Sequence, residues 1–332
     1  MKRAFKKVIF AFLILFFVLV LYFFVGKAPK AKDIGWGVTF SQKYAVQFGL
    51  DWKEAYLAVL DDLRVTNLRT IIYWDLFEPE PSEYVFEDID WQLQEAQKRG
   101  VKVILAMGMK TPRWPECNIP DWAKKLDKKS QQEKILEMIE VIVLKYKDSL
   151  AIEYWQIENE PFLVFGECPW YDKEFFKREV ALVRLLDYRG KPILITESGE
   201  LSTWFSSARI ADVVGVTMYR QTWWHKAGGF YAKYFLPPVH YWRKAQLVKN
   251  FFGKEVIVVE LQAEAWGPLP LYSLPIETQI EIMDVKDFRN NIKFAKRSGL
   301  DTFYLWGSEW WYYLKFKHNS PEIWEEAKKL WQ

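Results

Sequence analysis

Histidine and cysteine are scarce in this sequence of 332 residues, which has three and two of them respectively. Zinc and most transition-metal sites use several such side chains at close spacing, and the chain has no cluster of that kind. The sequence therefore predicts no metal site, and no motif in it asks for another cofactor. Low-complexity tracts and obvious internal repeats are also absent.

A basic surface for nucleic acid is missing as well. The net charge is +3, but seven basic residues flank one apolar segment near the N-terminus. They are Lys2, Arg3, Lys6, Lys7, Lys27, Lys30 and Lys32. The rest of the chain is slightly acidic, so no positive field remains to attract a phosphate backbone. We therefore expect no nucleic-acid partner.

The apolar segment covers residues 8–25 and contains no charged side chain. As a helix it would span about 27 Å, close to the thickness of a bilayer core. The basic residues before it favour a cytoplasmic N-terminus and an exported C-terminal part. A cleaved signal peptide is the alternative, but its apolar region would be long, and Pro29 follows the one small-residue site at Ala28. We expect a cytoplasmic stub at 1–7, an uncleaved anchor at 8–25, a linker at 26–33 and an extracytoplasmic domain at 34–332.

A short apolar run, a polar loop and an amphipathic stretch alternate eight times after the linker. The predicted strands are Ile34–Phe40, Asn67–Trp74, Val101–Met107, Ile152–Glu158, Pro192–Thr196, Asp212–Tyr219, Glu255–Glu260 and Thr302–Trp306. The predicted helices include Trp52–Leu63, Ile89–Arg99, Gln131–Tyr146, Lys173–Asp187, His240–Phe251, Glu281–Arg297 and Pro321–Leu330. The strands are apolar on both faces, as buried parallel strands are.

Eight βα units in about 300 residues predict an α/β fold, a closed (β/α)8 TIM barrel preceded by one N-terminal transmembrane helix. An open doubly wound sheet is the alternative. It would carry a glycine-rich phosphate turn after the first strand, and residues 39–42 contain no glycine.

Two carboxylates end the fourth and seventh predicted strands, where a barrel places its active residues. Glu160 follows the fourth strand, and Glu260 ends the seventh. These strands lie on opposite sides of the ring, so their carboxylates can face each other. Glycoside hydrolysis uses such a pair, one acid to protonate the leaving oxygen and one carboxylate to attack the anomeric carbon. The alternative for each residue is a solvated strand end or an ion pair.

Cys117 and Cys168 follow the third and fourth predicted strands. Neighbouring loops of a barrel lie side by side, and an exported domain meets an oxidising compartment, so we predict a disulfide between them. Two free thiols are the alternative.

The segment Tyr154–Pro161 resembles the acid/base motif of the clan A glycoside hydrolases, and it is most similar to the β-galactosidase-type families. The stretch Trp74–Phe86 resembles the same families and some cellulase-like ones. This resemblance implies a retaining hydrolase with Glu160 as acid/base and Glu260 as nucleophile, acting on a β-linked carbohydrate.

The resemblance also implies roles for four further residues. Arg69 matches the arginine that bonds the nucleophile, and Tyr219 the tyrosine that contacts it. Asn159 matches the residue that binds the sugar 2-hydroxyl, and Trp306 the platform under the reacting sugar. A structural ion pair for Arg69 and a core position for Trp306 are the alternatives. The histidines that many clan members carry near the third and sixth strands are missing, since His225, His240 and His318 lie elsewhere.

Loops after the strands are rich in tryptophan, whose rings can stack on sugar faces. We expect several of these residues, Trp266 among them, to line subsites. The set is Trp114, Trp170, Trp204, Trp223, Trp224, Trp266, Trp310 and Trp311. Three further carboxylates near the barrel mouth, Glu197, Glu200 and Glu264, are left unassigned.

Two rival functions use the same barrel. A transglycosidase would differ only in its acceptor, and a non-catalytic carbohydrate-binding barrel would be expected to lose one of the two carboxylates. The sugar, the linkage, exo or endo attack and the oligomeric state stay open at this point.

Overall fold

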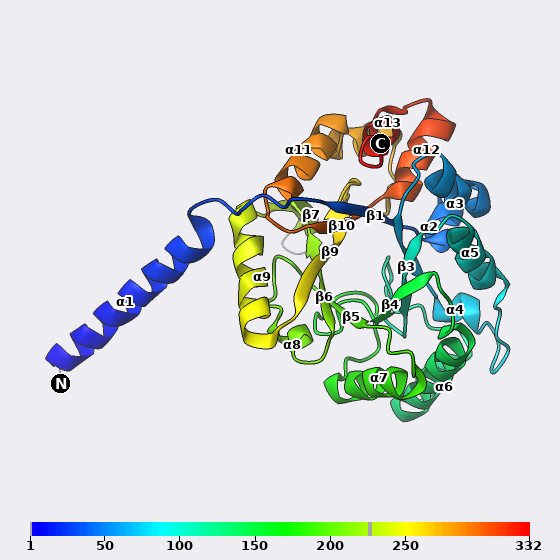
Figure 1. Cartoon of the computed structure of the whole chain (residues 1–332), viewed down its shortest axis with the longest axis horizontal. Helices are drawn as coiled ribbons and strands as arrows, with labels where there is room; N and C mark the ends of the chain where they lie inside the picture. The colour runs from blue at the N-terminus through cyan, green and yellow to red at the C-terminus, as the bar shows by residue number, and fades with distance from the viewer. Residues whose placement is uncertain (1, 225–227) are drawn as a thin grey trace.

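The chain folds into a closed eight-stranded parallel barrel, and one long helix precedes the barrel in the sequence (Figure 1). This architecture confirms the predicted fold class. The computed structural model describes residues 2–224 and 228–332, so His225 lies outside the described residues. The strands close in the order β1-β10-β9-β6-β5-β4-β3-β2. Their bounds are β1 (Gly35–Thr39), β2 (Asn67–Ile71), β3 (Lys102–Met107), β4 (Ile152–Ile157), β5 (Ile193–Glu197), β6 (Val213–Met218), β9 (Glu255–Gln262) and β10 (Thr302–Trp306).

Helices surround the barrel and follow most of its strands. They are α2 (Gln42–Gln47), α3 (Trp52–Asp61), α4 (Trp74–Phe77), α5 (Glu87–Lys98), α6 (Lys128–Tyr146), α7 (Lys173–Leu186), α8 (Phe205–Ala208), α9 (Pro238–Phe252), α10 (Ile276–Ile282), α11 (Val285–Lys296), α12 (Ser308–His318) and α13 (Glu322–Lys328). Aspartate caps four of them, since Asp51, Asp127, Asp172 and Asp284 each accept two backbone N–H groups of a first turn.

Several elements differ from the sequence expectation. The helix predicted over Glu281–Arg297 is interrupted, because Asp284 leaves the helical conformation to cap α11. An antiparallel pair, β7 (Gln221–Trp224) and β8 (Phe230–Lys233), follows β6 and was not predicted. The helix α12 was also missed, because it is buried around most of its circumference and has no amphipathic pattern to reveal it.

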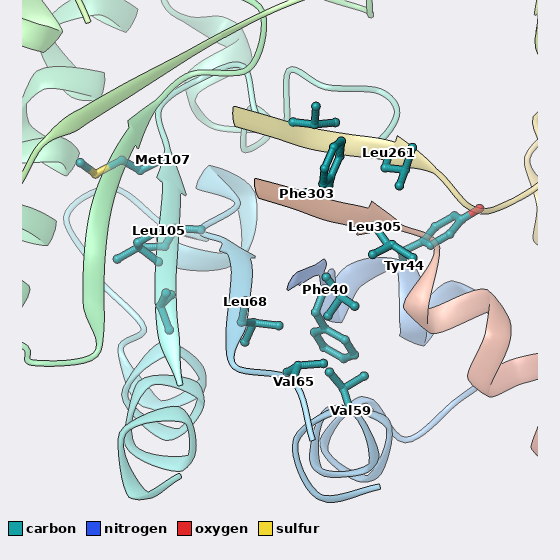
Figure 2. Close-up of a cluster of buried hydrophobic side chains, with 14 of the residues drawn as sticks. Phe40, Tyr44, Val59, Val65, Leu68, Leu105, Met107, Leu261, Phe303 and Leu305 are labelled. Carbon is teal, nitrogen blue, oxygen red and sulfur yellow. The ribbon is translucent and has the colours of Figure 1, made fainter. Parts of the chain in front are cut away.

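The core has two layers, one inside the barrel and one between the barrel and its helices. The inner cluster consists only of strand residues, with Ile104, Leu194, Ile257 and Val259 among them. The outer cluster joins strands to helices, and Figure 2 shows part of it, with Leu68 of β2 and Val59 of α3 among its side chains. Side chains of one strand therefore alternate between the two layers.

A register shift in β9 determines where Glu260 points. Val216 pairs with Val258 and Thr217 with Glu260, so β9 has one extra residue at this point. Val258 packs in the outer cluster and Val259 in the inner one, and strict alternation would turn Glu260 back toward the helices. The bulge breaks the alternation and leaves Glu260 at the barrel mouth, beside Arg69.

The N-terminal helix α1 (Lys2–Phe24) extends away from the barrel, and its end meets α9 (Figure 1). Residues Phe5–Phe24 have a mean hydropathy of 2.8, which suits either a membrane anchor or a signal helix. Arg243 donates through Nη1 to the carbonyl of Leu21 over 3.1 Å, and the rings of Phe23 and Phe24 contact His240. The cation at the C-terminal end of α1 complements the helix dipole there.

Candidate active site

The two predicted carboxylates lie in the same buried region at the C-terminal ends of the strands. Glu160 is 7% exposed and Glu260 is 4% exposed. Glu160 follows β4, whereas Glu260 lies within β9 and reaches the mouth through the bulge. The two carboxyl groups have different hydrogen-bond partners, so they can take different chemical roles.

Glu260 is held through both oxygens. Arg69 donates from Nη1 to Oε1 over 2.9 Å, and the Tyr219 hydroxyl donates to Oε2 over 3.0 Å. The Arg69 side chain is fully buried, so this ion pair is screened little by water. Both contacts are of the kind that an ionised carboxylate accepts.

Arg69 also connects three strands. Its Nε donates to Gln156 over 2.8 Å, and its Nη2 donates to the side-chain oxygen of Asn159 over 2.8 Å. One rigid guanidinium therefore fixes Glu260 and Asn159 relative to each other. The structure thus brings Arg69, Asn159 and Tyr219 together around Glu260, as the sequence prediction requires.

Glu160 has the opposite environment. Among the described residues no hydrogen-bond partner reaches its buried Oε1. Burial raises the pKa of Glu160 well above 4.5, and the nearby carboxylates of Glu260 and Glu116 raise it further. A protonated Glu160 can donate, which is what a general acid has to do.

The backbone at Glu160 adopts the left-handed conformation, with φ 43°. Such a conformation is unusual for a residue with a Cβ and is stabilised here by two contacts. The backbone N–H donates to the Thr196 hydroxyl over 2.7 Å, and the carbonyl accepts from Lys110 Nζ over 2.9 Å. Lys110 therefore helps to hold the main chain of Glu160 in place.

A second group of charges, missed from the sequence, lies on the loop after β3. Lys110 forms an ion pair with Glu116 over 3.2 Å, and Glu116 accepts from the side chain of Asn159 over 3.3 Å. Burial raises the pKa of Glu116 to about 7. The rule that barrel loops carry active residues could have indicated these two, but charged loop residues usually face water.

Trp306 lies at the mouth as predicted, but Arg113 covers one side of its ring. The guanidinium carbon of Arg113 is 3.9 Å from the Trp306 ring centroid and 3.8 Å from that of Tyr44. Arg113 forms ion pairs with Glu264 and with Glu309, the latter over 3.0 Å. Burial raises the pKa of Glu264 to about 7. Glu264 is thus part of a buried cluster rather than a solvated strand end.

The remaining unassigned carboxylates also have structural partners. Glu200 accepts the backbone N–H of Tyr219 over 2.7 Å and the Tyr241 hydroxyl over 2.8 Å, so it supports the tyrosine that contacts Glu260. Glu197 accepts the backbone N–H of Ser207 over 2.6 Å.

The tryptophans divide into two groups. Trp204, Trp310 and Trp311 are fully buried, and each indole N–H is bonded inside the protein, so these three pack the loops and are unavailable to sugar. Trp266 lies at the mouth, with its ring 5.1 Å from that of Tyr219. Trp266 also neighbours Phe165, and Phe165 neighbours Trp114, with ring centroids 6.3 Å and 6.0 Å apart.

Cys117 and Cys168 form a disulfide with their Cα atoms 5.2 Å apart. It joins the loop after β3, which carries Trp114, to the loop after β4, which carries Phe165. Among residues 2–224 and 228–332, no three His, Cys, Asp or Glu side chains gather in a way that could hold a metal ion.

Behind the site, Glu179 on α7 is buried and both its oxygens lack a partner among the described residues. Burial and the neighbouring Glu158 raise its pKa well above 4.5. The folded chain therefore retains a proton that the unfolded chain releases, so stability falls as pH rises from about 4.5 through the folded pKa.

We therefore expect Glu179→Gln to raise the free energy of unfolding at pH 8 by about 1–3 kcal/mol, because the neutral amide folds without having to take up a proton. Below pH 4.5 the gain should vanish, since both side chains are then neutral in either state. Urea denaturation at the two pH values measures the effect, with Glu174→Gln on the exposed first turn of α7 as control. An equal gain at both pH values would contradict the explanation.

Comparison with known proteins agrees with this geometry. Residues 51–177, which include Arg69, Asn159 and Glu160, match the family model for β-galactosidase. The fold is similar to a β-galactosidase from Rahnella sp. R3, with a TM-score of 0.57 and 12% identity over 92% of this chain and 57% of that enzyme. It is also similar to xylanase 10B from Thermotoga petrophila RKU-1, with a TM-score of 0.53 and 15% identity over 83% of this chain and 82% of that one.

A third similar structure is a β-glucosidase from Exiguobacterium marinum, with a TM-score of 0.51 and 13% identity over 84% of this chain and 89% of that one. A comparison with curated proteins gave no match. The chain spans 57% of the length of the Rahnella enzyme, and at these identities the solved structures show the fold alone. Over residues 51–177 the chain is thus similar to the β-galactosidase family, and its closed parallel barrel is similar to the folds of these solved glycosidases.

Proposed function

We propose that this protein is a retaining β-glycoside hydrolase with Glu260 as nucleophile and Glu160 as acid/base. The observation that carries the proposal is the contrast between the two carboxylates. Glu260 accepts hydrogen bonds from Arg69 and Tyr219, whereas Glu160 is buried with a raised pKa. A carboxyl group with a raised pKa can serve as the acid, and a partner that accepts hydrogen bonds from an arginine and a tyrosine can serve as the nucleophile.

The reaction would proceed in two displacements. An oxygen of Glu260 attacks the anomeric carbon, the bond to the leaving oxygen breaks, and Glu160 gives that oxygen its proton. The Glu160 carboxylate then takes a proton from water, the water oxygen attacks the same carbon, and Glu260 departs. Asn159, whose side-chain oxygen accepts a hydrogen bond from Arg69, would bind the sugar 2-hydroxyl.

The stereochemistry of the first product tests this mechanism. Purified full-length protein in detergent is given a panel of aryl β-glycosides, with the matching α-glycosides as control. We expect cleavage of a β-glycoside, and proton NMR taken before mutarotation should show the β-anomer of the released sugar. The α-anomer appearing first would mean a single displacement and would remove Glu260 from the role of nucleophile.

We also propose that α1 is an uncleaved anchor that holds the barrel outside the cytoplasm. Basic residues precede the apolar segment, and the contacts of Arg243 and His240 seat the end of α1 against α9. The intact mass of protein purified from membranes should include residues 1–28. A mature chain that begins after Ala28 would show that α1 is a signal helix.

A further inference from the structure

A cavity of about 270 Å³ lies on the helix side of the barrel wall. It is lined by residues of the antiparallel pair β7 and β8, of the end of β9 and of α11. Tyr219 reaches Glu260 inside the mouth with its hydroxyl. The next residue, Arg220, lines the cavity instead and stacks on Phe294 of α11, with its guanidinium carbon 4.0 Å from the ring centroid. Successive side chains of an extended segment point to opposite faces, so the cavity and the two catalytic carboxylates lie on opposite sides of the wall.

The wall of this cavity is held together by Gln262, near the end of β9. Its side-chain oxygen accepts the backbone N–H groups of Arg220 and Gln221 over 2.8 Å and 3.1 Å. Its side-chain nitrogen donates to the carbonyl of Gln221 over 2.7 Å. These three bonds tie the start of the β7–β8 pair to the barrel, so the cavity is formed before any ligand arrives, as small-molecule sites usually are.

Arg220 brings a cation without an acidic partner into the cavity. Its Nη1 donates to the carbonyl of Leu236 over 3.0 Å, and Phe294 supports its flat face. Among the described residues no carboxylate forms an ion pair with Arg220, and burial lowers its pKa. The guanidinium is thus held in place while most of its N–H groups stay available. A fixed planar donor of this kind suits a carboxylate, which it can bind through two parallel hydrogen bonds.

The rest of the lining suits the ring and hydroxyls of a sugar. The ring of Phe235 is 86% exposed and Tyr234 beside it is half-buried, so both offer a face to a ligand. Asn291 donates to the carbonyl of Gln262 over 3.0 Å, which leaves its side-chain oxygen to accept a hydroxyl. The exposed carboxylate of Asp287 can accept another. Aromatic rings with a few placed polar groups are typical of small-ligand sites, and the volume suits one sugar unit.

We propose that this cavity binds a sugar acid, with its carboxylate paired to Arg220 and its ring against Phe235. The charges favour an anion, since Arg220 and Lys233 line the cavity against the single carboxylate of Asp287. The inference goes beyond the proposed function, because the site lies outside the mouth and takes no part in breaking the bond. Such a site would hold an acidic glycan on the protein while the carboxylate pair acts elsewhere on the chain.

Two probes that differ only at C6 test the role of the charge. Methyl α-D-glucuronide carries a carboxylate where methyl α-D-glucoside carries a hydroxymethyl group, and neither has the β-linkage that the proposed hydrolase cleaves. Isothermal titration calorimetry of full-length protein in detergent should show the glucuronide binding at least about 10-fold more tightly, because the bond to Arg220 is charge-assisted. Equal affinity for the two probes, or no binding of the glucuronide, would overturn the inference.

Acetate separates a sugar-acid site from a general anion site. It has the carboxylate but no ring to lie against Phe235 and no hydroxyls, so it should bind at least about 10-fold more weakly than the glucuronide. Acetate that binds as tightly would contradict the proposed ligand. Hydrolysis of the aryl β-glycosides is measured on the same preparation. Protein that binds the glucuronide and cleaves no β-glycoside would count against the proposed function alone.

Two variants place the probe in this cavity. Arg220→Gln should lower the affinity for the glucuronide about 10-fold or more and leave that for the glucoside unchanged. Phe235→Ala should weaken the binding of both probes by about 2- to 10-fold, because the ring face is lost, and so exposed a side chain is not needed for folding.

The controls are Arg289→Gln, which removes a surface ion pair with Glu326, and Phe251→Ala at the exposed end of α9. Both should bind the probes as the wild type does. Wild-type affinity for the glucuronide in folded Arg220→Gln would show that the probe binds elsewhere and would refute the site. If that variant does not fold, Phe235→Ala decides in the same way.

Discussion

Replacing Glu260 with alanine should lower kcat/KM on aryl β-glycosides by at least about 10⁴-fold, because the covalent route then has no nucleophile. Arg69 and Tyr219 would remain, but they hold Glu260 and do not themselves attack carbon. Glu255→Ala is the matched control, since it changes the same residue type at the exposed start of the same strand. Its activity should equal that of the wild type.

Rescue by azide can show that the group lost in Glu260→Ala is the nucleophile. A small anion can occupy the space that Glu260 vacates and attack the anomeric carbon from the same side. With an activated aryl β-glycoside, Glu260→Ala should therefore recover activity in azide and yield the α-glycosyl azide. A Glu260→Ala protein that keeps wild-type activity without azide would move the nucleophile to another residue.

Replacing Glu160 with glutamine should slow the cleavage of oligosaccharides by about 10²- to 10⁴-fold, since a poor leaving group needs a proton. The rate of the first step should fall less on aryl glycosides with acidic phenols, because their leaving oxygen departs as the anion and needs no proton. The wild-type rate on oligosaccharides should fall as pH rises through the raised pKa of Glu160, and this dependence should disappear in the variant.

The configuration of the azide product separates Glu160 from Glu260. In Glu160→Ala the glycosyl-enzyme still forms on Glu260, and azide then attacks from the face that water normally uses. The expected product is the β-glycosyl azide, opposite to that of the Glu260 variant. Glu167→Gln, an exposed carboxylate in the same loop, serves as control. The same azide anomer from both variants would show that the two roles are wrongly assigned.

The eight strands could be predicted because each is a short, mostly apolar run and a helical stretch follows most of them. The direction of the Glu260 side chain could not be predicted from that pattern alone. Period-two alternation turns Glu260 toward the helices, and only the bulge beside Val259 returns it to the mouth. A bulge depends on the pairing of neighbouring strands, which a single strand sequence does not contain.

The cluster around Arg113 could not be predicted from the sequence for a related reason. Arg113, Glu264 and Glu309 lie up to 196 residues apart and are brought together only when the ring closes. The resemblance indicated Trp306 as the platform under the reacting sugar, and the structure adds a cation that covers one side of its ring. Charged loop residues give no sequence sign that they will be buried together.

The disulfide between Cys117 and Cys168 links the maturation of the mouth to the place where the protein folds. The two cysteines lie on the loops that follow β3 and β4, which pair side by side, so the bond links two neighbouring loops of the barrel mouth. In a reducing compartment the carboxylate pair could form while the loops that carry Trp114 and Phe165 stayed unlinked. If the barrel is exported, as proposed, the link between these two loops would form only outside the cytoplasm, and the mouth would reach its final form there.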